Sequence, residues 1–180
     1  GRTLVDLRTT GDVHIRRLTA HASLQILAAN VDVADGGRLA TLGRSGGLIL
    51  GADDRDGTVR IGKKAHVNFN YGGSIDAGDL VVGDASRLIQ RKRIATKHFT
   101  TLRGRAIHLG KGIRIQSTDI GSWSVEGFSD VEAEGLRFMG SGLTVRARCD
   151  ALSPSHKHIR VTHSRFHGPI FLSVFCDEPI

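Results

Sequence analysis

The chain has 180 residues, of which 39% are hydrophobic and 5% aromatic, so its apolar content suffices for the core of one domain. A formal net charge of +7 and a sequence pI ≈ 10.1 favour anionic partners, namely acidic polysaccharide or cell-surface glycan. No run of about 18 apolar residues occurs, and the N-terminal segment lacks the apolar core of a signal peptide. We therefore expect no membrane insertion and no signal peptide in this chain. Strand-like sequence at both ends predicts that residues 1–180 form one β-helical domain, a fragment of a longer chain.

The first predicted strands repeat at a spacing of 28 residues. When 30–39 is aligned with 58–67, Val31, Val33 and Leu39 match Val59, Ile61 and Val67, an offset of 59 − 31 = 28. Likewise, 46–51 matches 73–78 at an offset of 27, which pairs Leu48 with Ile75 and Leu50 with Ala77. Both matches predict strands that stack on their counterparts one coil later.

A basic segment, 87–98, interrupts this pattern. Its cationic residues are Arg87, Arg91, Lys92, Arg93 and Lys97. We predict a surface loop, which either docks an acidic polymer or is a solvated excursion. Stacking aromatic residues are absent from the run, so nucleic acid is not an expected partner.

The clearest repeat lies near the C-terminus. Segment 131–140 matches 159–168 at an offset of 28, and 142–150 matches 169–177 at 27. The second match places Cys149 over Cys176, either as a buried pair of small side chains or as a disulfide. Apolar residues alternate with polar ones in each piece, as strands require. The pattern predicts an all-β parallel β-helix solenoid of about six coils with a period of 27–28 residues.

One coil carries the motif I-x-V-x-x-S-x-F-x-G at Ile159, Val161, Ser164, Phe166 and Gly168. This motif resembles the right-handed parallel β-helix repeat of pectate-lyase-like proteins, phage tailspikes and adhesin passengers, most clearly over 128–177. The resemblance implies an extracellular, cell-surface or virion location. It implies little about activity, because this architecture serves both enzymes and adhesive stalks.

Two enzyme classes are alternatives. A polysaccharide lyase or hydrolase is one, since Glu132 and Glu134 would lie about 6.6 Å apart on one strand, although such pairs are common on strand surfaces. The other is a hexapeptide acyltransferase, with His66 or His108 as candidate base. Its aliphatic-Gly motif is matched by segments 42–48, 61–67, 82–88 and 109–115.

The outward positions of the C-terminal strands give the candidate binding site. Its predicted members are Arg146, Arg148, Phe171, Phe175 and Arg160. Guanidinium groups beside aromatic rings suit either an acidic sugar or an interface in a homo-oligomer such as a trimer. The nearby histidines lack the convergent spacing of a zinc site, so no metal and no cofactor are expected. The sequence therefore favours a rigid recognition or structural module over an enzyme.

Overall fold

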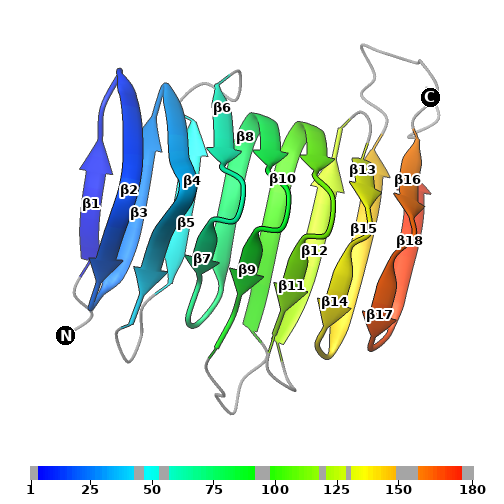
Figure 1. The fold of residues 1–180 in the computed structure, drawn as a ribbon. Helices are drawn as coiled ribbons and strands as arrows, with labels where there is room; N and C mark the ends of the chain where they lie inside the picture. The colour runs from blue at the N-terminus through cyan, green and yellow to red at the C-terminus, as the bar shows by residue number, and fades with distance from the viewer. Residues whose placement is uncertain are drawn as a thin grey trace.

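The computed structural model describes residues 4–42, 47–52, 57–91, 98–117, 121–128, 131–148 and 158–175. Within these residues the chain is an all-β parallel solenoid without helices, and its coil number is close to the six expected. Figure 1 shows the coils side by side along a rod, with the N-terminal and C-terminal coils at opposite ends. None of the described segments is a helix long and apolar enough to cross a membrane.

Each coil contributes strands to three faces of the rod, and four long strands bend across two faces. The first face stacks β1 (Leu4–Arg8), β3 (Ser23–Ala28), β5 (Leu48–Ala52), the first halves of β8 (Gly73–Val82) and β10 (His98–Leu109), then β12 (Gly121–Gly127), β15 (Gly142–Arg148) and β18 (Ile170–Phe175). The second face stacks the first halves of β2 (Asp12–Ala20) and β4 (Asn30–Thr41), then β6 (Thr58–Ile61), the second halves of β8 and β10, β13 (Val131–Glu134) and β16 (Ile159–Thr162). The third face stacks the second halves of β2 and β4, then β7 (His66–Asn68), β9 (Arg87–Ile89), β11 (Arg114–Gln116), β14 (Arg137–Met139) and β17 (Arg165–His167).

The core is a set of aliphatic ladders that run through the coils. In β3, for example, buried Leu24, Ile26 and Ala28 alternate with less buried neighbours, because successive side chains of a strand point to opposite sides. Midway along the rod, Phe69 and Trp123 fill the interior with an edge-to-face contact, at a centroid distance of 5.3 Å. Each pair of facing coils thereby buries apolar surface that one coil alone would expose.

Most of the predicted register is confirmed. Val31 pairs with Val59, and Val131 pairs with Ile159, both at an offset of 28. The match between 46–51 and 73–78 is wrong by two residues, because Leu48 lies beside Gly73 and Leu50 beside Ile75. The coils also vary in length: Asp12 pairs with Asn30, an offset of 30 − 12 = 18. Corner loops of different lengths absorb this variation while the strands stay in register.

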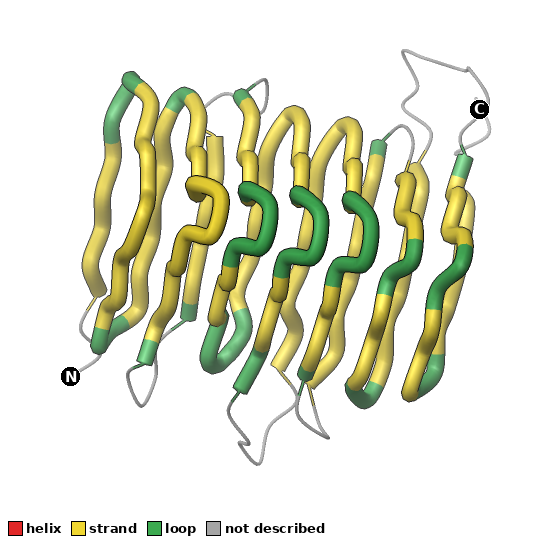
Figure 2. The backbone as a smooth tube through the Cα atoms, in the orientation of Figure 1, coloured by secondary structure: helices red, strands yellow, loops and turns green. Residues whose placement is uncertain are grey.

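The corner between the second and third faces is the most regular part of each coil. One residue per corner has a positive φ, and these residues are Gly36, Lys64, Ala85, Gly112, Gly135 and His163. Figure 2 shows these turns stacked as hooks along the rod. Glycine adopts this backbone readily, which explains why His163 stands where the preceding coil has Gly135. His163 is therefore a corner residue of the repeat.

The hexapeptide-like segments 61–67, 82–88 and 109–115 all form this same corner. Their glycine N–H groups donate to the coil before, as Gly83 N does to the Ile61 carbonyl at 2.7 Å. A Cβ on Gly83 would lie 2.6 Å from the backbone N of Lys63, so glycine is required for this approach. The motif occurs once per coil at one corner, whereas left-handed hexapeptide coils use it at three. The corner therefore accounts for the motif without an acyltransferase.

Candidate anion-binding face

Charged side chains on the outward side of the first face are paired. Arg103 lies 3.8 Å from the carboxylate of Asp76 and 3.3 Å from that of Glu126. The other oxygen of Glu126 lies 3.6 Å from Arg146 and accepts a hydrogen bond from Ser124 at 3.0 Å. The Glu126 side chain is only 12% exposed. Bases and acids thus neutralise one another along this row.

The second face also pairs its charges. Arg60 donates to Asp32 at 2.6 Å, and His14 lies 3.3 Å from the same carboxylate. Burial acts to raise the pKa of Asp32, but the hydrogen bonds from Arg60 and His14 outweigh it and the pKa is lowered. This carboxylate is consequently ionised in a pair of bases on neighbouring coils.

The two glutamates considered as catalytic candidates belong to this paired surface. Glu132 lies 3.6 Å from His108, and Glu134 lies 3.1 Å from the ammonium of Lys111. All four side chains are half or more exposed. Their geometry is that of surface ion pairs between coils, which contribute modestly to stability.

The third face is different, because its outward charges are all basic. One position per strand forms a row in register across β2, β4, β7, β9, β11, β14 and β17, which we call the arginine row: Arg17, Arg38, His66, Arg87, Arg114, Arg137 and Arg165. The third-face segments contain no Asp or Glu, and no carboxylate of the described residues pairs with the row. At about 4.8 Å per coil, the row extends over roughly 29 Å.

Such a row opposes folding, because like charges directly opposite each other on neighbouring strands repel. All six arginines are exposed, and solvent screens part of the repulsion. The half-buried His66 has a lowered pKa, through burial first and then through the charges of Arg87, Arg38 and Arg91. The row therefore concentrates positive potential along a line, as a linear anionic ligand would require.

Two adjoining grooves of about 800 and 300 Å³ lie beside the row and share Gln116, Met139 and His167 as lining residues. Arginines of the row line both of them. The buried Gln90 side chain also lines the larger groove, and its Nε2 has no hydrogen-bond partner among the described residues. Amide, hydroxyl and thioether groups thus accompany the guanidinium groups, a mixture that suits the hydroxyls and ring faces of a sugar.

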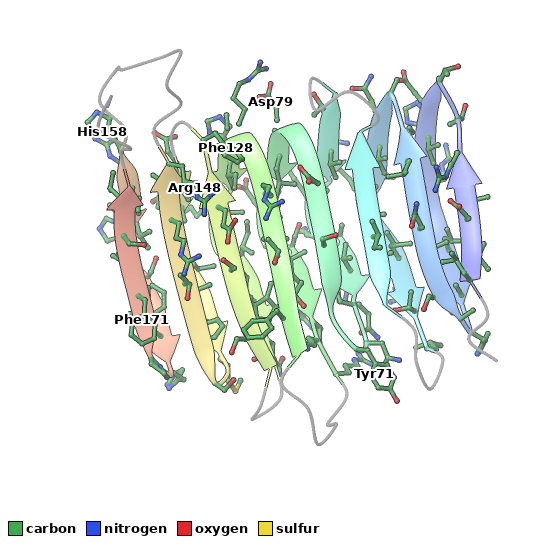
Figure 3. All side chains as sticks on the ribbon, turned by 180° about the vertical axis from the view of Figure 1, so that it is seen from behind. Tyr71, Asp79, Phe128, Arg148, His158 and Phe171 are labelled. Atoms are coloured by element: carbon green, nitrogen blue, oxygen red, sulfur yellow. The ribbon has the colours of Figure 1, made fainter. Side chains whose placement is uncertain are left out.

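The structure does not bring all five predicted binding residues together. Arg148 pairs in register with Phe175 on the first face, whereas Phe171 lies four residues away beside Thr144, about 13 Å along the strand. Figure 3 shows Arg148 and Phe171 near opposite ends of their strands. Arg160 lies on the second face, beside Glu132.

Arg146 of that predicted group already has a partner in Glu126, at 3.6 Å. Arg148 and Phe171 are exposed, and Phe171 retains 62% of its accessible surface. The first face therefore offers an arginine and a phenylalanine that are far apart, rather than one compact site.

The basic segment 87–98 divides between a strand and other residues. Arg87 is the first residue of β9 and belongs to the arginine row, and Arg91 lines the larger groove beside it. Lys92, Arg93 and Lys97 lie outside the described residues, as do Cys149 and Cys176. The described part of the segment thus contributes to the third face.

The sequence does contain a signal for the arginine row. Each third-face strand begins with a corner residue of positive φ, a second residue, the row residue and then an inward apolar residue, in the tetrapeptides GGRL, KAHV, ASRL, GIRI, GLRF and HSRF. They begin at 36, 64, 85, 112, 135 and 163, with spacings of 28, 21, 27, 23 and 28. Because these spacings are uneven, a search at a fixed period finds only the last pair, Arg137 over Arg165.

Among the described residues, no group of three or more His, Cys, Asp or Glu side chains is arranged to hold a metal ion. Comparison with known proteins gave no match to any family model, to any curated protein or to any solved structure.

Proposed function

We propose that this chain is a rigid recognition rod that binds an extended anionic polymer along the arginine row, with acidic polysaccharide as the ligand class. The carrying observation is that the row is uniformly basic, while charges on the other two faces are paired. A surface protein of a cell or virion is the setting in which such a rod would meet its ligand.

The one-dimensional form of the row supports a polymer as its ligand. Neighbouring guanidinium groups branch from strands about 4.8 Å apart, so a small anion would engage one or two of them. A chain that lies along the rod axis would engage most of the row at once. Arginine is suited to this role because its planar fork binds carboxylate or sulfate with two hydrogen bonds.

The surroundings of the row favour a glycan over a nucleic acid. Binding of single-stranded nucleic acid relies on aromatic side chains that stack with bases. The exposed phenylalanines of the described residues, Phe99 and Phe171, belong to the first face. Beside the row lie Gln116, Ser117 and Met139 instead.

Two variants of equal charge distinguish the third face from the first. Arg114→Gln with Arg137→Gln removes two charges from the row, and Arg146→Gln with Arg148→Gln removes two from the first face. We expect the third-face variant to bind fluorescent oligogalacturonate about tenfold or more weakly, and the first-face variant to bind as the unmodified chain does. The reverse result would overturn the assignment of the site.

Lateral self-association is a second candidate function, favoured by apolar exposure on the first face. Phe99 and Phe171 are each 62% exposed there, and Ile49 is 40% exposed. Exposed apolar side chains of this size often mark contacts between protomers. Sedimentation velocity tests this proposal: a trimer that Phe171→Ser dissociates supports it, and a monomer at high concentration contradicts it.

A further inference from the structure

The arginine row has one position that is not arginine. His66 on β7 lies between Arg38 on β4 and Arg87 on β9, with Cα atoms in register with both. Figure 1 shows β7 between these two strands on the rod. The row is therefore continuous in geometry, while its charge at this position depends on a proton.

Only cationic groups face His66 from the elements packed against it. β4 contributes Arg38, β9 contributes Arg87, and Arg91 follows β9; the nearest charged residue on its own segment is Lys64. Burial and these charges lower the pKa of His66, because each disfavours the imidazolium form. In the free protein at neutral pH the imidazole is consequently neutral and separates the arginines into two blocks.

We propose that His66 is a proton-dependent contact of the polymer site: an anionic polymer that spans Arg38, His66 and Arg87 recruits a proton to the imidazole, so that binding strengthens as the pH falls. This inference rests on the proposed function, because it requires that a polymer occupies the row. The proton comes from solvent and adds one cationic hydrogen-bond donor to the site.

The direction of the effect follows from linkage between proton and polymer binding. Anionic groups beside His66 raise its pKa in the complex relative to the free protein. The gain in affinity is therefore complete below the lowered pKa of the free protein. It decreases as the pH rises through the pKa of the complex, and above that value the affinity no longer depends on this residue.

Dextran sulfate is a suitable probe, because its sulfate groups remain fully charged between pH 5 and pH 8. We expect the unmodified chain to bind about tenfold more tightly at pH 5 than at pH 8. His66→Gln should bind equally weakly at both pH values, and His66→Arg equally tightly at both. His167→Gln is the matched control: it removes a histidine that lines the groove beside the row and should keep the pH dependence.

Calorimetry gives a second readout that a merely structural role would not change. Binding near the midpoint of the pH dependence, measured in two buffers of different ionisation enthalpy, should show uptake of up to one proton by the unmodified chain and none by His66→Gln. A pH-independent affinity, or a dependence that persists in His66→Gln, would overturn the role of His66 and leave the proposed function standing. Absence of binding at every pH would overturn both.

Discussion

Arg114 and Arg137 lie directly opposite each other on β11 and β14, with their Cα atoms in register. No carboxylate of the described residues pairs with either guanidinium. On the opposite side of the rod, Arg103 and Glu126 make the paired arrangement that neighbouring strands ordinarily prefer. The contrast indicates that stability alone does not account for the third face.

Neutralising one member of the row should stabilise the folded chain. Arg114→Gln removes repulsion from Arg87 and Arg137, so we expect the free energy of unfolding to rise by about 0.5 kcal/mol. The urea midpoint, followed by the fluorescence of the buried Trp123, measures this change. Arg103→Gln is the control and should lower the midpoint, because it leaves Glu126 with fewer partners. A fall in the midpoint for Arg114→Gln would show that the row is not repulsive.

The salt dependence of polymer binding should report the number of arginines engaged. Each cationic contact with a densely charged polymer releases about one counterion, so log K falls linearly with log salt concentration. We expect the double variant Arg114→Gln with Arg137→Gln to reduce this slope by about 1 to 2 for dextran sulfate. The pair Arg146→Gln and Arg148→Gln should leave it unchanged. Equal slopes for all three chains would exclude the row as the contact surface.

Replacing the corner histidine with glycine should increase stability and leave binding intact. His163 has a φ of 51°, a backbone conformation that costs a non-glycine residue of the order of 1 kcal/mol. His163→Gly should therefore raise the urea midpoint, whereas His163→Ala should not. Unchanged affinity for dextran sulfate is expected for both variants. Loss of binding in both would instead give this histidine a role in ligand contact.

Asp32 should make the stability of the second face depend on pH. Its folded-state pKa is lowered by Arg60 and His14 despite partial burial, so the unfolded chain binds more protons in the acidic range. The stabilisation is thus present above the unfolded-state pKa and is lost as the pH falls through the folded-state pKa. Asp32→Asn should lower stability at pH 7 and reduce its decline on acidification. Parallel stability profiles for the two chains would contradict this contribution.

Much of the fold could be predicted from local sequence. The alternation in 142–150 identifies a strand, and the matches of Val131 with Ile159 and of Phe138 with Phe166 are confirmed as neighbours on successive coils. Prediction failed where the local signal was weak. Leu48 and Leu50 fit several aliphatic partners equally well, so the sequence alone did not fix their register.

The binding surface could be predicted only in part. The excess of basic residues pointed to an anionic partner, but the search for it centred on Arg146 and Arg148, where the repeat was clearest. Glu126, which neutralises Arg146, comes from the preceding coil at a different spacing. A charge and its partner are 20 residues apart here, so only the stacking of β12 on β15 could show that the site was already neutralised.

The sequence by itself determined the alternation of inward and outward side chains, the recurrence of strands and the overall positive charge, because these depend on composition and on near neighbours in the chain. Tertiary structure decided which charges meet. Corner loops of unequal length bring the tetrapeptides from GGRL to HSRF into one line, although their spacing varies from 21 to 28 residues. Coulombic interaction depends on distance in space, and the stacking of coils alone sets that distance. For this reason six arginines separated along the chain form a single row, and His66 stands within it.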